Sequence, residues 1–485
     1  AAIQSADLAG MQTTDLRALT TNQVAAFSSG QLSGMTTNQI ANLETDDVAA
    51  LTTAALQGLS SDQIVALTTD EIQALTTAQV AALKTAQIAA LNTLQISKME
   101  TSDIAAMTTA QVAALNSDQL VAFTTDQIQA LKTAQIAAIT TLDISNMQTT
   151  DLQALTTAQA AALTSVQIGA MNTNEIRNLE TADLASLTSS ALDGMTTTQI
   201  QAISTDQISA LTSAQVASLS TAQVAAILTT DLQAMTTNQF AALSSAQLAG
   251  MSTTQIRNIE TADIAAVTTA ALQGLTTDQA GVLTTDQLQA MTTAQFASIS
   301  SRQQGALNTL QINKIETGDI AALTTSALQG LTTNQISLNN GTTDQVSVLT
   351  TDQLIAMTSA QFAALKTAVI AAMNTVQINK LESADVAALT TAQVVAMATN
   401  QIAALNTEQV AALKTAQVAA LHTDQIAAIE TVDLQAMTSD QFAVLSSAQL
   451  AAMSTLQIGK IETGDIAALT TAALQGLTTN QISLN

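Results

Sequence analysis

Eight short segments of the chain carry a glutamate followed three residues later by an aspartate, and these acidic pairs are the residues best suited to chemistry. The glutamates are Glu44, Glu100, Glu180, Glu260, Glu316, Glu382, Glu430 and Glu462, and the aspartates are Asp47, Asp103, Asp183, Asp263, Asp319, Asp385, Asp433 and Asp465. A pair of carboxylates at a backbone bend can supply oxygen ligands for a cation, so the acidic pairs predict calcium binding.

Two other interpretations of the acidic pairs stay open. Two carboxylates are fewer ligands than calcium normally takes, and the spacing is not that of an EF-hand or a Gly-Gly-x-Gly-x-Asp repeat. Six pairs are preceded by a cation: Lys98, Arg177, Arg257, Lys314, Lys380 and Lys460. The pairs could therefore form local ion pairs at a bend, which contribute little when exposed, or lateral contacts between molecules.

Other catalytic or cofactor chemistry has little support in the composition. The chain contains one histidine, His422, and no cysteine, which leaves little basis for a His-based triad and none for a zinc site. Neither a P-loop nor a dinucleotide-binding glycine motif is present. We expect His422 to be a solvated side chain, the chain to have no enzymatic activity, and calcium to be its one candidate cofactor.

The charge balance restricts the partners. The chain has 12 basic and 37 acidic residues and a net charge of −25. Nucleic acids and anionic membrane surfaces both require clustered cations, so neither is an expected partner. Polar pairs interrupt the apolar residues every eight positions, so no segment is expected to insert into a membrane.

An eight-residue motif, Leu-Thr-Thr-x-Gln-Ile-x-Ala, accounts for this pattern. With the leucine as position 1, the motif recurs about sixty times, from Met11 onward. All 15 methionines stand at position 1, and all six phenylalanines stand at position 1 or 6. No lysine or arginine occupies positions 1, 3, 5 or 6. Positions 1 and 6 are therefore predicted to form the core, and repetition indicates a one-dimensional array.

The spacing of the apolar residues favours helix over strand. Positions 6 and 1 are three residues apart, as on one helix face, and do not alternate as in a strand. In the octad that contains Thr69, we expect Ile72 and Leu75 to be buried, and Asp70 and Gln73 to be exposed, with Thr69 at position 3 as the N-cap. Such short helices are unstable alone, so they must stack.

The predicted fold is an all-α solenoid of one-to-two-turn helices, one per octad. A β-solenoid with two octads per coil is the alternative, because Thr, Ile and Val also favour strands. The glutamine that recurs at position 5 is predicted to form a ladder of amides that hydrogen-bonds backbone groups at the bends.

Two solenoid blocks are predicted, residues 1–339 and residues 340–485. The register slips once, by two residues, where Asn340-Gly341 is typical of a turn. The segment that starts at Phe27 recurs from Leu243 and again from Leu445, which indicates duplication of a longer block. The first ten residues lack Met and the shape of a signal peptide, so we expect a processed or longer parent protein.

The runs LTTAQVAALKTAQIAALNTLQI and LKTAQVAALHTDQIAAI resemble the octad arrays of large bacterial surface and adhesin-like repeat proteins. The resemblance covers nearly the whole chain, although the motif specifies little chemistry. The Thr- and Ala-rich, acidic, cysteine-free composition is also similar to that of secreted S-layer proteins, which implies calcium dependence.

These observations predict an extracellular or cell-surface structural protein that forms a filament, sheath or adhesin stalk. Its expected partner is the chain itself, as a homo-oligomer or filament. The alternative is a surface module that binds calcium or cell-surface glycans at the acidic octads.

Overall fold

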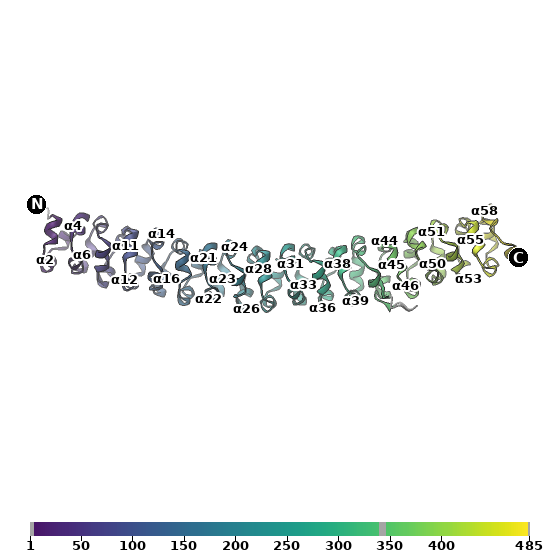
Figure 1. The fold of residues 1–485 in the computed structure, drawn as a ribbon, viewed down its shortest axis with the longest axis horizontal. Coiled ribbons are helices and arrows are strands. Elements are labelled where there is room, and N and C mark those ends of the chain that lie inside the picture. The colour runs from purple at the N-terminus through teal and green to yellow at the C-terminus, as the bar shows by residue number, and fades with distance from the viewer. Residues whose placement is uncertain (1–3, 339–345, 484–485) are drawn as a thin grey trace. The chain divides into compact units, whose positions relative to one another are not determined.

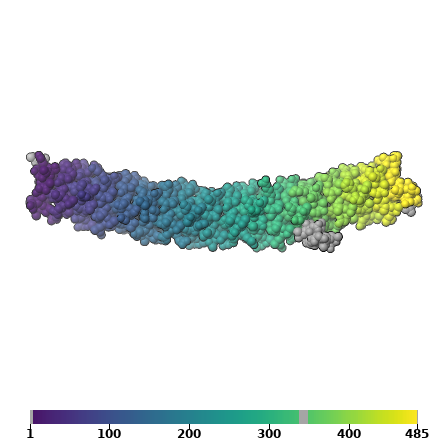
Figure 2. Space-filling model, viewed as in Figure 1, coloured from purple at the N-terminus to yellow at the C-terminus, as the bar shows by residue number. Residues whose placement is uncertain are grey.

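The computed structural model describes residues 4–338 and 346–483, which belong to two units, Ala1–Gln239 (unit 1) and Phe240–Asn485 (unit 2). In each unit the octads form short α-helices, one after another along the chain (Figure 1). The prediction of an all-α solenoid is confirmed. Within either unit the colour in Figure 2 changes gradually, because segments far apart in sequence do not mix.

Each helix begins at position 3 of its octad and ends at position 6, 7 or 8. Representative helices of unit 1 are α1 (Ser5–Ala9), α4 (Ser29–Gly34), α7 (Thr53–Leu56) and α10 (Thr77–Ala82), and those of unit 2 include α31 (Ser245–Gly250), α34 (Thr269–Leu272) and α59 (Thr479–Ile482). At the C-terminal end, position 1 returns to an extended conformation, as at Leu83 with φ −59° and ψ 144°. This break after each helix keeps the apolar residues of successive octads facing the core.

The N-cap is the residue at position 2, so the prediction that position 3 supplies the N-cap was wrong. In α10 the hydroxyl of Thr76 accepts a hydrogen bond from the Gln79 N–H (3.3 Å), and Gln79 Oε1 accepts one from the Thr76 N–H (2.7 Å). This reciprocal pair is a capping box, which requires the capping residue three positions before the glutamine. Position 3 therefore already belongs to the first turn of the helix.

The core is built as the octad pattern predicts. Ile72 and Leu75 are 1% and 5% exposed, whereas Asp70 and Gln73 of the same octad are exposed. The fully buried residues include Phe240, Phe296, Phe362 and Phe442, all at position 6. Most octads thus contribute two large apolar side chains to the interior of their unit.

One turn of the solenoid contains between three and four octads. Helices pack against the helix three octads along the chain, as α1 does against α4 and α31 against α34. Hydrogen bonds between successive turns join residues 25 to 31 positions apart, for example Arg17 to the carbonyl of Asn42 and Gln39 to the carbonyl of Leu8. The number of octads per turn could not be predicted from the motif, because every octad has the same pattern.

The described residues contain one pair of very short strands, β1 (Ser337–Leu338) and β2 (Val346–Ser347), which are antiparallel. The alternative β-solenoid is therefore wrong. Gln335 binds the carbonyl of Gln304, 31 residues earlier, whereas Gln353 binds that of Ile312, 41 residues earlier. The ladder therefore continues past the register slip, where the distance in sequence to the bonded carbonyl is ten residues longer, which equals one octad plus the two residues of the slip. The predicted turn at Asn340-Gly341 and the predicted boundary after residue 339 lie outside the described residues.

Gln304 is an exception within the core of unit 2. It occupies position 6 and is 0% exposed, yet neither its amide oxygen nor its amide nitrogen has a hydrogen-bond partner among the described residues. A buried amide without partners loses its hydration and gains nothing in return. Position 6 elsewhere holds Ile, Leu, Val, Phe or Ala.

Replacing Gln304 by methionine, which has a similar shape, is expected to stabilise the protein by about 1–2 kcal/mol because no polar group is then left unpaired. Thermal unfolding followed by circular dichroism would measure the gain. Gln303→Met is the matched control, since Gln303 is bonded at position 5 and its replacement should destabilise. Destabilisation by both substitutions would contradict the prediction.

Candidate functional site

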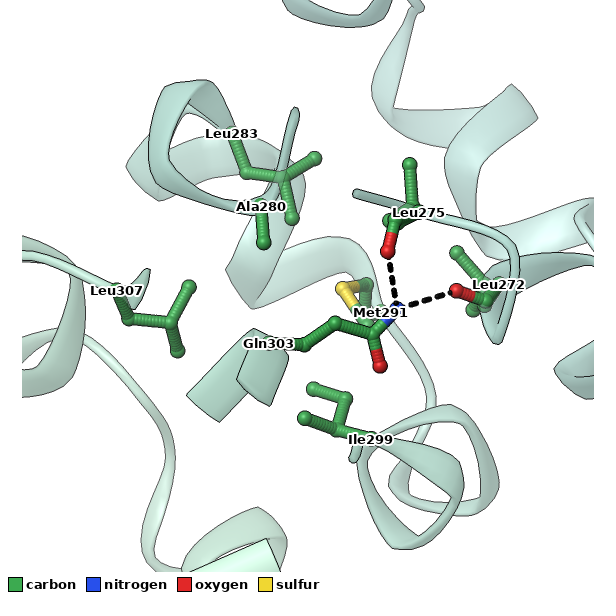
Figure 3. A pocket seen from close by; sticks show the side chains of 8 residues that line it. All are labelled: Leu272, Leu275, Ala280, Leu283, Met291, Ile299, Gln303 and Leu307. Atoms are coloured by element: carbon green, nitrogen blue, oxygen red, sulfur yellow. Dashed lines mark hydrogen bonds between the residues drawn. The ribbon is translucent and has the colours of Figure 1, made fainter. Parts of the chain in front are cut away.

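The position-5 glutamines form the most regular polar array of the protein. Each lies at the third residue of its helix, where Oε1 accepts the N–H of its own N-cap residue. In most of these glutamines Nε2 donates to two carbonyls of the preceding turn, at positions 6 and 1, whereas Gln457 Nε2 donates to positions 7 and 1. Gln303 has the common arrangement and donates to Leu272 (2.8 Å) and Leu275 (3.0 Å), as Figure 3 shows. The predicted amide ladder at the bends is therefore confirmed, and it connects successive turns within each unit.

Breaking one step of the ladder is expected to destabilise the protein. In Gln111→Leu, the N–H of Thr108 and the carbonyls of Val80 and Leu83 lose hydrogen bonds of 2.7, 2.7 and 2.8 Å. Buried polar groups left unpaired cost about 1–3 kcal/mol. Chemical denaturation would measure the loss, with the exposed Gln153→Leu as control. Equal effects of the two substitutions would contradict a bonding role for position 5.

An apolar cavity of about 10 Å³ lies beside Gln303 in the core of unit 2 (Figure 3). It is lined by Leu272, Leu275, Ala280, Leu283, Met291, Ile299, Gln303 and Leu307. Ala280 stands at position 6, where most octads place a larger side chain. A space of this size accommodates at most about one water molecule, so it is a packing defect and not a ligand site.

In each of the eight predicted acidic pairs, one residue is exposed and the other is buried. Every glutamate of the set is an exposed N-cap residue without a side-chain cap hydrogen bond: Glu44, Glu100, Glu180, Glu260, Glu316, Glu382, Glu430 and Glu462. Every aspartate is buried at position 5: Asp47, Asp103, Asp183, Asp263, Asp319, Asp385, Asp433 and Asp465. The two carboxylates of a pair therefore lie in different environments.

Some of these aspartates are bonded across turns in place of the glutamine. Ser359 Oγ donates to Asp385 Oδ1 (2.8 Å) and Ser439 Oγ to Asp465 Oδ1 (2.6 Å). At Asp183, by contrast, Oδ2 is buried without a hydrogen-bond partner among the described residues. The serine three octads before the aspartate supplies the donor, a relation that the octad motif alone did not reveal.

Burial raises the pKa of several position-5 acids. For Asp103, Asp183 and Asp263, desolvation, and then the charge of the glutamate three residues earlier, raises the pKa from 3.8 to about 6. Desolvation also raises the pKa of Asp319, Asp385 and Asp433. These carboxyl groups therefore take up protons at a higher pH than an aspartate in an unfolded chain does.

Calcium binding at the acidic pairs stays a prediction. The described residues contain no group of three or more His, Cys, Asp or Glu side chains placed to hold a metal ion. Calorimetry with calcium, before and after replacement of Glu316 and Asp319, would test one of the eight pairs. His422 is an exposed N-cap residue, as expected.

The predicted local ion pairs are not formed by the six cations that precede the acidic pairs. Across the described part of the chain, the ion pair present joins Arg17 Nε to Glu44 Oε1 (3.4 Å), on neighbouring turns. Both side chains are more than half exposed, so the pair contributes little to stability. Of the six cations before the glutamates, Arg177 instead donates from Nε to the carbonyl of Ala202 on the next turn (3.4 Å).

A set of exposed apolar residues was missed by the sequence analysis. Seven octads carry Leu or Val at position 4, with 56–67% of the residue exposed: Leu94, Leu142, Val166, Leu310, Val376, Val432 and Leu456. The signal was present in the sequence, since position 4 otherwise holds small or polar residues. No helix among the described residues has the length and apolar character that a bilayer crossing requires.

The comparison with protein families agrees with the octad arrangement. No curated protein matches the chain. The model of the ALTTAQ repeat matches thirteen segments, residues 1–37, 40–77, 70–99, 96–133, 136–173, 176–213, 224–258, 256–293, 312–338, 354–391, 378–415, 426–461 and 458–484. Together these segments cover most of the sequence, so the chain belongs to the ALTTAQ repeat family.

Proposed function

We propose that the protein is an extracellular structural repeat protein that forms a filament, sheath or adhesin stalk by self-association. The observation that carries the proposal is the glutamine ladder, which bonds most octads to octads one turn away within their unit. Such an array gains length with every added octad and needs no closed globular centre. Scaffolds that span distance require this property, whereas enzymes require a converging set of reactive groups.

The surface chemistry supports an extracellular location. The chain has no cysteine and a net charge of −25, so it has no thiols to oxidise and it repels other acidic surfaces. Its exposed faces carry mainly Thr, Ser, Asp and Ala side chains. On this basis we expect no enzymatic activity, and we expect the chain itself to be its main partner.

Electron microscopy of the purified protein would test the structural role. We expect elongated particles, and filaments or bundles at higher concentration. Insertion of a second copy of residues 243–330 should lengthen the particles in proportion to the added octads. Compact, monodisperse particles whose dimensions do not change with octad number would contradict the proposal. Protease accessibility on intact producing cells would test the location.

A further inference from the structure

One surface arrangement recurs four times in the described residues. The segments TLQISKME (93–100), TLQINKIE (309–316), TVQINKLE (375–382) and TLQIGKIE (455–462) each place an exposed Leu or Val, a Lys and a Glu at the same octad positions. We refer to these residues as the Leu–Lys–Glu clusters: Leu94, Lys98 and Glu100; Leu310, Lys314 and Glu316; Val376, Lys380 and Glu382; Leu456, Lys460 and Glu462.

Within each cluster the lysine follows four residues after the apolar residue, inside the helix in the first cluster and at or just beyond the helix end in the other three. In α12 (Thr93–Lys98), Leu94 and Lys98 are four residues apart and therefore neighbours on the helix surface. Leu94, Leu310, Val376 and Leu456 are 59%, 62%, 59% and 63% exposed. The glutamate follows two residues after the lysine, as the exposed N-cap of the next helix.

The core does not explain these residues. Single exposed leucines are common on protein surfaces, but here the apolar residue recurs with the same charged neighbours at four separate places. None of the four lysines forms an ion pair within the described segments. Cations are scarce in this chain, with 12 basic against 37 acidic residues, and four of the 12 lie in the clusters.

The charge distribution identifies the partner. Two copies of a chain with net charge −25 repel each other over most of their surface, and repulsion is relieved only where cations lie. A cluster contains both signs of charge beside an apolar side chain, so it is complementary to a cluster on another copy. It is also complementary to the exposed position-4 aspartates, such as Asp126 and Asp286. Such self-complementary contacts are typical of homo-oligomers.

We propose that the four Leu–Lys–Glu clusters are lateral docking sites for a second copy of this chain. In the contact, the leucine or valine of each cluster is covered by the partner copy, and the lysine pairs with a carboxylate of that copy. The inference rests on the proposed self-association and specifies the surface that performs it. Several weak clusters act together, because linked contacts multiply in strength along an array.

Sedimentation velocity over a range of concentrations would test the clusters in the full chain. The test variant combines Leu94→Thr, Leu310→Thr, Val376→Thr and Leu456→Thr, since Thr already stands at position 4 elsewhere, as at Thr198 and Thr254. The control combines Ala78→Thr, Ala294→Thr, Ala392→Thr and Ala416→Thr, which change position 4 outside the clusters. Circular dichroism would verify that both variants keep the wild-type helix content.

We expect the test variant to need at least about tenfold higher concentration for association, which corresponds to 1.4 kcal/mol, and the control to behave as wild type. Reversing the charges of Lys98, Lys314, Lys380 and Lys460 to Glu should weaken association further. If the wild type associates and the test variant associates equally well, the clusters are not the docking sites, although self-association stands. If the wild type stays monomeric at every concentration, the proposed function fails with them.

Discussion

Gly58→Ala is expected to destabilise unit 1 by about 3 kcal/mol, at the upper end of the usual cost of overpacking. Gly58 stands at position 8, where its Cα faces the backbone of Ser29 on the preceding turn. A Cβ added there would overlap the carbonyl oxygen, carbonyl carbon and Cα of Ser29. Because these are backbone atoms, α4 and α7 must separate to accommodate the methyl group. Thermal unfolding, together with hydrogen exchange of both helices, would measure the effect.

Gly30→Ala is the matched control, because Gly30 is next to Ser29 in sequence but has no atom within 4 Å of an added Cβ. Alanine favours helix over glycine by about 1 kcal/mol, so this variant should be as stable as wild type or more stable. A Gly58→Ala protein with wild-type stability would show that the turns are not held as closely as the geometry indicates.

Lowering the pH from about 7.5 to about 4.5 is expected to raise the unfolding midpoint, by on the order of 5 °C. The pKa values of Asp103, Asp183 and Asp263 are raised from 3.8 to about 6, first by burial and then by the neighbouring glutamate. A group whose pKa is higher in the folded state binds more protons there than in the unfolded chain. The resulting stability is fully present below about pH 3.8 and is lost as the pH rises through about 6.

The combined variant Asp103→Asn, Asp183→Asn and Asp263→Asn would show whether these groups cause the pH dependence. Asparagine is uncharged at every pH, so the variant should have a higher midpoint than wild type at pH 7.5 and a smaller change on acidification. Asp62→Asn, Asp126→Asn and Asp286→Asn replace exposed position-4 aspartates as a control. Protein that loses stability steadily between pH 7 and 5 would disprove the buried-acid explanation.

The octad motif predicted those features that lie within one octad. Helix class follows from the three-residue spacing of Ile72 and Leu75, and the burial of both confirms it. The N-cap was assigned one residue too late, because a Thr–Thr pair offers two equally good capping residues. The glutamine three residues after the first of them was the deciding signal, since only that spacing completes the capping box.

Relations between octads could not be predicted, because they depend on how many octads make one turn. Gly58 contacts Ser29, and four further pairs have the same separation of 29 residues: Gly194 and Ser165, Gly274 and Ser245, Gly330 and Ser301, and Gly476 and Ser447. The glycines and serines are visible in the sequence, but only the turn length brings them together. The same holds for Ser359 and Asp385.

The acidic pairs were identified by residue type, whereas the different burial of their two residues could not be predicted from the sequence. Glutamate and aspartate three residues apart suggested carboxylates that converge on one ion. Position 2, however, lies at the exposed start of the helix, whereas position 5 faces the preceding turn. Glu316 is therefore exposed and Asp319 buried. Sequence spacing alone does not distinguish a converging pair from a pair that spans the boundary between surface and interior.

From Gln335 to Gln353, the distance in sequence to the bonded carbonyl increases by ten residues without a break in the ladder. This tolerance has a consequence for how genes of this kind change length. Recombination between repeats adds or removes pieces of DNA, and a piece does not always encode a whole number of octads. In unit 2 the glutamines on both sides of this junction, Gln335 and Gln353, keep backbone carbonyl partners on the preceding turn. Imprecise duplication can therefore yield a folded product, and selection can act on many lengths of the same protein.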